Sequence, residues 1–192
     1  RTDIDGKDVP LTTLDKNGNK IENGEIPVAI ELSSLKINKE DFTMTKGTSE
    51  TLTVTGTPAE ALEGQTITWK SSNKDVVTVD SKGKVEAVGV GNATITATAA
   101  GKSDSVKITV NNPLKKITVD PATFTLKKGT SKTLSVKYDP ADTTDNKAVT
   151  WESSDKSVAT VDANGKVTAL KDGSATITAK IGKLTATCAL TV

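Results

Sequence analysis

Residues 68–97 read TWKSSNKDVVTVDSKGKVEAVGVGNATITA, and residues 150–179 read TWESSDKSVATVDANGKVTALKDGSATITA. The second stretch repeats the first at a constant offset of 82 residues. The same offset aligns residues 30–110 with residues 112–192 without a gap, and 33 of the 81 aligned positions are identical. A unit of about 80 residues is too long for a solenoid repeat and suits one small sandwich domain. The chain is therefore predicted to contain two copies of a whole module.

Apolar and polar residues alternate within each copy. The segments ATITA at 93–97 and VKITV at 106–110 are examples, and they return as ATITA at 175–179 and CALTV at 188–192. A period of two predicts β-strands with one buried face and one wet face. Turn signals such as the Asn-Gly dipeptide at 164–165 separate the strand segments. About seven short strands in each copy, with no helical stretch, predict an antiparallel β-sandwich.

The composition supports this fold and excludes several classes of function. The chain has 32 threonine and 18 valine residues, and β-branched side chains favour extended strands. Its 25 basic and 24 acidic residues leave a net charge of +1, which provides no basic field for nucleic acid and no attraction to anionic membranes. No apolar run reaches the roughly 18 residues that a membrane-spanning helix needs. We therefore expect no nucleic-acid partner and no membrane insertion.

The residues that carry most enzyme chemistry are missing or scattered. The chain has no histidine, which excludes a Ser-His-Asp triad, a Cys-His pair and an imidazole zinc site. The single cysteine, Cys188, lies in an alternating segment and is predicted to be a buried apolar side chain. We interpret the acidic pairs Glu60 and Glu63, and Asp139 and Asp142, as solubilising surface groups in loops. The chain is predicted not to be an enzyme and to have no catalytic residues, no cofactor-binding residues and no metal ligands.

Five aromatic residues are present, and four of them recur at equivalent positions of the two copies. Trp69 and Trp151 either form a sugar-stacking platform or fill the core. The scarcity of other aromatic side chains favours the core. Phe42 and Phe124 are predicted to lie in the core for the same reason. Tyr138 has no aromatic counterpart in the first copy, and it is predicted to be a local surface feature.

Both copies contain the pattern WxSSxxxVxxVDxxGxVxAxxxGxAxITA. This pattern resembles the bacterial immunoglobulin-like group 2 domain family, known from intimin- and invasin-type adhesins and from bacteriophage tail and capsid proteins. The resemblance runs from about Leu32 to Val110 and from about Leu114 to Val192. It implies immunoglobulin-like sandwiches on a cell or virion surface, without shared catalytic residues and without one common ligand.

The predicted fold class is all-β, with two tandem antiparallel Ig-like β-sandwich domains preceded by a short N-terminal β and loop segment. The predicted boundaries are 1–29 for the N-terminal segment, 30–111 for the first domain and 112–192 for the second. The connection between the domains, Asn111-Asn112-Pro113, is too short for a floppy tether, and its proline stiffens it further. We therefore expect the two domains to stack end to end as a semi-rigid rod.

Residues 1–29 have no counterpart in the repeat. An Asn-Gly dipeptide between short apolar runs predicts a hairpin there, which we interpret as the tail end of a preceding domain. Two clusters of side-chain oxygens raise the question of calcium, but neither has the glycine and the distant glutamate that a calcium loop needs, so solvated turns are favoured. The clusters are Asp3, Asp5 and Asp8, and Asp15, Asn17, Asn19 and Glu22. Because the chain starts without methionine or a signal peptide, we expect it to be a piece of a longer protein.

The sequence leaves three functional contexts open. The favoured one is a non-catalytic, extracellular pair of cell-surface modules that acts as a semi-rigid spacer for display and adhesion in a larger protein. Its expected partners are other domains of the same longer chain and a glycan or protein receptor on a bacterial or host surface. One alternative is a phage tail or capsid domain of the virion that attaches weakly to bacterial surface carbohydrate. The other is an accessory region of a secreted carbohydrate-active enzyme.

Overall fold

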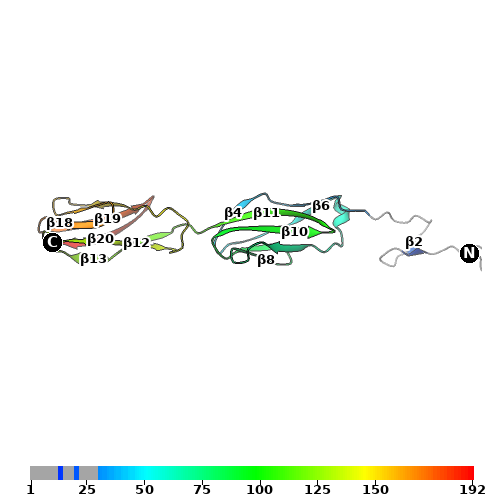
Figure 1. The fold of residues 1–192 in the computed structure, drawn as a ribbon, viewed down its shortest axis with the longest axis horizontal. Coiled ribbons are helices and arrows are strands. Elements are labelled where there is room, and N and C mark those ends of the chain that lie inside the picture. Colours follow the sequence, from blue (N-terminus) through cyan, green and yellow to red (C-terminus); the bar gives the residue numbers. More distant parts are fainter. Residues whose placement is uncertain (1–12, 15–19, 22–29) are drawn as a thin grey trace, which may run out of the picture.

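The computed structural model describes residues 13–14, 20–21 and 30–192 of the chain. Residues 30–192 form two β-sandwich modules that lie end to end along the long axis of the molecule (Figure 1). Apart from one turn of 3-10 helix, η1 (Ala59–Leu62), all the elements of the described residues are strands, which confirms the all-β prediction. Within this described part, no helix is long and apolar enough to cross a membrane.

The N-terminal segment contributes two short strands. β1 (Thr13–Leu14) and β2 (Lys20–Ile21) pair in antiparallel orientation, with Thr13 opposite Ile21. This pairing confirms the predicted hairpin. The two clusters of side-chain oxygens, for which solvated turns are predicted, lie outside the described residues: Asp3, Asp5, Asp8, Asp15, Asn17, Asn19 and Glu22.

Module 1 (residues 30–111) contains nine strands in two layers. One layer is the four-stranded sheet β4-β11-β10-β7, and the other consists of the small sheets β3-β6 and β5-β9-β8. The strands are β3 (Ser34–Ile37), β4 (Phe42–Thr45), β5 (Ser49–Thr51), β6 (Val54–Thr57), β7 (Thr68–Ser71), β8 (Val77–Val79), β9 (Lys84–Ala87), β10 (Gly91–Ala99) and β11 (Lys102–Asn111).

Module 2 (residues 112–192) repeats this arrangement strand for strand. Its layers are the sheet β13-β20-β19-β16 and the small sheets β12-β15 and β14-β18-β17. The strands are β12 (Lys116–Asp120), β13 (Thr123–Thr125), β14 (Ser131–Thr133), β15 (Ser135–Asp139), β16 (Thr150–Ser153), β17 (Ala159–Val161), β18 (Lys166–Ala169), β19 (Ser174–Ile181) and β20 (Leu184–Thr191).

The topology differs from the prediction in two respects. Each module has nine strands instead of about seven, because the chain breaks between β3 and β4 as it changes sheets and again between β5 and β6. In addition, β4 lies parallel to β11, and β13 lies parallel to β20. Between β3 and β4, and between β12 and β13, the chain crosses from one layer to the other without reversing its direction. β4 and β13 therefore run in the same direction as β11 and β20, the last strands of their modules. The other pairs of described strands are antiparallel.

Each module buries its own hydrophobic cluster between its two layers. The alternation seen in the sequence is responsible: in β10, Ala93, Ile95 and Ala97 are buried while the residues between them face outward. Cys188 on β20 is fully buried, opposite Ile177 of β19, as predicted. Burial raises the pKa of its thiol, which keeps Cys188 protonated and unreactive in the folded module.

Candidate functional site

The joint between the modules is an ordered polar contact. β11 ends at Asn111, and Asn112 is 7% exposed although it lies between two domains. Its main chain is bonded to one residue of module 2. The Asn112 N–H donates to Thr144 Oγ1 at 3.1 Å, and the Thr144 N–H donates to the Asn112 carbonyl oxygen at 2.9 Å. These bonds fix the connector against the loop at residues 140–149, which we call the joint loop.

Two carboxylates of the joint loop extend this contact. Asn112 Nδ2 donates to Asp142 Oδ1 at 2.7 Å, and the Leu114 N–H donates to Asp145 Oδ2 at 2.8 Å. Pro113 lies between these two bonds and has no N–H to satisfy. The connector is therefore held on both sides of its proline.

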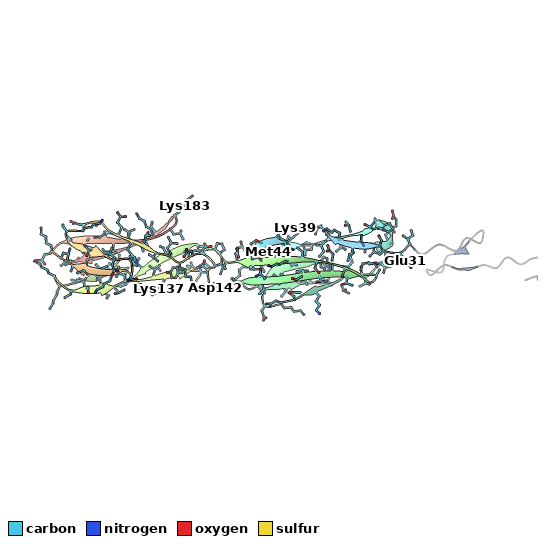
Figure 2. The ribbon with its side chains drawn as sticks, turned by 45° about the horizontal axis from the view of Figure 1, so that its top comes forward. Glu31, Lys39, Met44, Lys137, Asp142 and Lys183 are labelled. Carbon is cyan, nitrogen blue, oxygen red and sulfur yellow. The ribbon has the colours of Figure 1, made fainter. Side chains whose placement is uncertain are left out.

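Module 1 contacts the same loop through Lys46, in the turn between β4 and β5. Lys46 Nζ donates to Asp142 Oδ2 at 2.6 Å. The turn itself is fixed, because the Lys46 N–H donates to the Asn111 carbonyl at 2.8 Å and the Gly47 N–H donates to the Ala87 carbonyl at 2.7 Å. Figure 2 shows Asp142 at the narrow waist between the modules. One oxygen of Asp142 thus binds the connector, and the other binds module 1.

The charge state of Asp142 follows from these contacts. The hydrogen bond from Lys46 lowers the pKa of Asp142 below its ordinary value. The positive charge of Lys46 and the bond from Asn112 also lower this pKa, whereas desolvation raises it. Asp142 is therefore ionised at neutral pH. The Lys46–Asp142 pair is partly exposed, with side-chain exposures of 37% and 53%, so salt screens it.

Asp142 is exposed in a loop, as predicted, but it is more than a solubilising group, because it accepts hydrogen bonds from both Lys46 and Asn112. The two copies differ at the positions that form the joint. Module 1 has Ile30, Glu60 and Leu62 where module 2 has Asn112, Asp142 and Thr144. Glu60, Glu63 and Asp139 are exposed, as predicted, although Glu60 lies in η1 and Asp139 ends β15 instead of lying in loops.

The tryptophans occupy the rim of the core instead of its centre. Trp69 and Trp151 are half-buried and pack against the clusters of their modules. Trp69 lies on β7 and Trp151 lies on β16, and both strands are edge strands. This position explains why one side of each indole reaches the surface. Each indole packs on a glycine with positive φ: a Cβ atom on Gly83 would lie 2.9 Å from Trp69 Cζ2, and one on Gly165 would lie 2.8 Å from Trp151 Cζ2.

The remaining aromatic residues are also half-buried against the clusters. Phe42 and Phe124 carry lysine ammonium groups over their rings, at 4.8 Å for Lys39 and 5.7 Å for Lys132. Tyr138, expected as a surface feature, packs against the core of module 2 from β15. None of these aromatic side chains is fully buried, because two thin sheets leave little room behind them.

The described residues contain no group of three acidic or cysteine side chains that is arranged to hold a metal ion. Side-chain pairs of opposite charge are scattered over the surface, as between Lys180 and Glu152 at 2.9 Å. Polar side chains of the described residues also brace the strands, as where the Ile37 N–H donates to Asp104 Oδ2 at 2.7 Å.

Comparison with known proteins agrees with this description. The profile of the bacterial Ig-like domain (group 2) family matches residues 32–110 and again residues 113–192. Ice-binding protein 1 of Shewanella frigidimarina is 32% identical over 168 residues, which is 84% of this chain and 19% of that protein. Lacto-N-biosidase of Bifidobacterium bifidum is 41% identical over 105 residues, which is 53% of this chain and 9% of that enzyme.

A solved structure of similar fold is that of the N-terminal four Ig domains of Dscam1 isoform 4.44. It matches with a TM-score of 0.54 at 14% identity and covers 85% of this chain and 48% of that chain. This likeness concerns the fold alone. The two matches to the family profile cover both modules, and the chain belongs to the bacterial Ig-like domain (group 2) family.

Proposed function

We propose that the two modules act as a non-catalytic, semi-rigid spacer that displays neighbouring domains of a larger extracellular protein. The hydrogen bonds at the joint support this proposal. Asp142 bonds to the connector and to module 1 at once, so bending at the joint requires breaking specific hydrogen bonds. A pair of modules joined in this way holds its ends apart, whereas a flexible linker lets them collapse.

The relatives support an accessory role. The chain spans 19% of the ice-binding protein and 9% of the lacto-N-biosidase, so the matching modules accompany much longer regions in both. The extracellular location of the present pair is part of this proposal. The same mechanical role would serve a phage particle or a carbohydrate-active enzyme, the two other contexts that the sequence leaves open.

In this proposal, a glycan or protein receptor on a cell surface is contacted mainly by the domains that the pair displays. The joint then determines how far from the anchor those domains reach. No catalytic role is proposed: the chain lacks histidine, and carboxylates such as Asp142, Glu152 and Asp104 bond to lysine side chains or to backbone N–H groups.

The spacer role can be tested on a surface. The tandem would be anchored by a C-terminal tag to a supported bilayer, and the thickness of the protein layer would be measured by neutron reflectometry. The comparison variant carries Gly-Gly-Ser inserted between Asn111 and Asn112, which keeps both modules but separates the joint. We expect the wild-type layer to be thicker than that of the insertion variant. Layers of equal thickness would contradict the proposal.

A further inference from the structure

The hairpin turn between β17 and β18 contains an asparagine followed by a glycine, Asn164-Gly165. The Asn164 side chain is exposed, and Gly165 has a positive φ of 77°. An asparagine before a glycine can react with its own main chain, because glycine has no side chain to hinder the approach of its nitrogen to the asparagine Cγ. This dipeptide is therefore a chemically reactive point on the surface of module 2.

Module 1 forms the same turn without an asparagine. Lys82 stands there at the position of Asn164, and Asp80 Oδ1 accepts the Lys82 N–H at 2.8 Å. In module 2, Asp162 Oδ1 accepts the Asn164 N–H at 2.9 Å. Folding of the turn thus requires the main chain at this position and the aspartate before it, but not a side-chain amide. Module 1 is therefore a matched control for the chemistry of Asn164.

The folded turn restrains the nitrogen that would react. The Gly165 N–H donates to the Asp162 carbonyl oxygen at 3.1 Å, and the Gly165 carbonyl accepts the Leu134 N–H at 2.9 Å. Asp162 Oδ1 also accepts the Lys166 N–H at 2.9 Å. The Gly165 nitrogen must lose its hydrogen bond, and its peptide group must rotate, before it can bond to Asn164 Cγ. The reaction therefore requires local opening of the turn.

We infer that Asn164 is a site of spontaneous deamidation and that opening of the turn limits its rate. The Gly165 nitrogen attacks Asn164 Cγ, and a bond forms between these two atoms. The Cγ–Nδ2 bond breaks, and Nδ2 leaves as ammonia with the proton of the Gly165 N–H. Water then opens the resulting five-membered succinimide ring at one of its two carbonyl carbons. The product is an aspartyl residue or an isoaspartyl residue, in which the main chain runs through Cγ.

An isoaspartyl residue at this position disturbs the packing of module 2. It adds one atom to the main chain directly before Gly165, and it places a second carboxylate near that of Asp162. A Cβ atom on Gly165 would lie 2.8 Å from Trp151 Cζ2 and 3.1 Å from the Leu134 carbonyl oxygen, so the surroundings of this glycine leave no room for a shifted main chain. Deamidation therefore destabilises module 2 and leaves module 1 unchanged.

The first test follows the reaction in the whole chain at mildly alkaline pH, with and without concentrated urea. Trypsin cleaves after Lys156 and Lys166, so residues 157–166 form one peptide whose only asparagine is Asn164. Chromatography with electron-transfer mass spectrometry distinguishes its asparaginyl, aspartyl and isoaspartyl forms. We expect isoaspartate in both samples, formed at least about ten-fold faster in urea, because the hydrogen bonds of the turn are then lost. Absence of isoaspartate from the folded chain after several weeks, or equal rates in the two samples, would overturn the inference.

Two variants test the restraint that the turn imposes. Asp162→Ala removes the side-chain acceptor of two N–H groups, so deamidation of the folded chain should be about five-fold faster, while the rate in urea stays the same. Asp80→Ala, at the equivalent position of module 1, should leave the rate at Asn164 unchanged. Both aspartates are exposed, so the variants are expected to fold. Equal rates in the two folded variants would overturn the role of the turn, and if Asp162→Ala unfolds, the wild-type rates with and without urea decide.

The second test compares the stability of module 2 before and after this incubation. In a Trp69→Phe background, the fluorescence of Trp151 reports the unfolding of module 2 in urea. We expect the deamidated chain to unfold at a lower urea concentration than the fresh chain. Asn164→Gln is the control, since Lys82 of module 1 shows that the turn accepts a long side chain and glutamine cyclises far more slowly; its midpoint should not change on incubation. Equal midpoints of the fresh and deamidated chains would overturn the predicted loss of stability.

Discussion

Lys46 of module 1 donates a hydrogen bond of 2.6 Å to Asp142 of module 2, across the joint between two separately folded domains. The second oxygen of the same carboxylate accepts a bond of 2.7 Å from Asn112 in the connector. A single side chain thus links the three parts whose relative motion would bend the molecule. The turn that carries Lys46 is itself bonded to Asn111, so the contact is positioned from both sides.

Removal of this contact should loosen the joint without unfolding either module. Asp142→Asn weakens the contact with Lys46, and Asp142→Ala also removes the acceptor of the Asn112 amide, so the loosening should increase in that order. Spin labels at positions 70 and 183, in a Cys188→Ala background, would report it as a broader distance distribution in pulsed EPR. Lys46→Met should act like Asp142→Asn. Lys128→Met, at the equivalent position of module 2, is the matched control and should leave the distribution unchanged.

The joint should also respond to acid. The bond from Lys46 lowers the pKa of Asp142. The contact between ionised Asp142 and Lys46 therefore stabilises the joint fully above the ordinary aspartate pKa, and this stabilisation is lost as the pH falls through the lowered pKa. A carbon-13 titration of the Asp142 carboxyl would give this pKa directly. In Lys46→Met it should rise toward the ordinary value. An unchanged pKa in that variant would show that Lys46 does not bind Asp142 in solution.

The contact between Gly165 and Trp151 makes a prediction about stability. Gly165→Ala places a Cβ atom 2.8 Å from the indole on a backbone with φ of 77°, so both strain and overpacking destabilise module 2. Gly129→Ala has the same kind of backbone, with φ of 80°, but open space around the added atom. We expect Gly129→Ala to cost about 1–2 kcal/mol and Gly165→Ala about 1–3 kcal/mol more. Urea unfolding measures the loss of stability in both variants. Equal losses would mean that the Trp151 indole moves aside for the added Cβ atom without destabilising module 2.

The fold was predictable from sequence because its signals are local. Alternation in segments such as residues 93–97 specifies strands, and the repeat specifies two modules. The joint was not predictable in the same way, because Asp142 acquires its partners only when the loop that carries it lies beside Asn112 and Lys46. The half-burial of Trp151 depends likewise on β16 being an edge strand, which the order of strands in the sequence does not reveal. The parallel pairing of β4 with β11 likewise depends on the spatial order of the strands, which their order in the sequence does not reveal.

Cys188 provides a probe of module 2 alone, since it is the single cysteine of the chain and is fully buried. Its raised pKa and its burial should prevent reaction with Ellman's reagent in the native state. In increasing urea, the labelling rate should rise together with the unfolding of module 2. Rapid labelling without denaturant would show that β20 opens locally.

In the proposed spacer, the two modules move as one body. Nitrogen-15 relaxation of the tandem tests this, because the rotational diffusion of each module is obtained separately. We expect both modules to fit a single, strongly anisotropic diffusion tensor with a common long axis, and Asp142→Ala to weaken that common fit. Two independent tensors in the wild-type chain, each with the correlation time of one small domain, would contradict the claim.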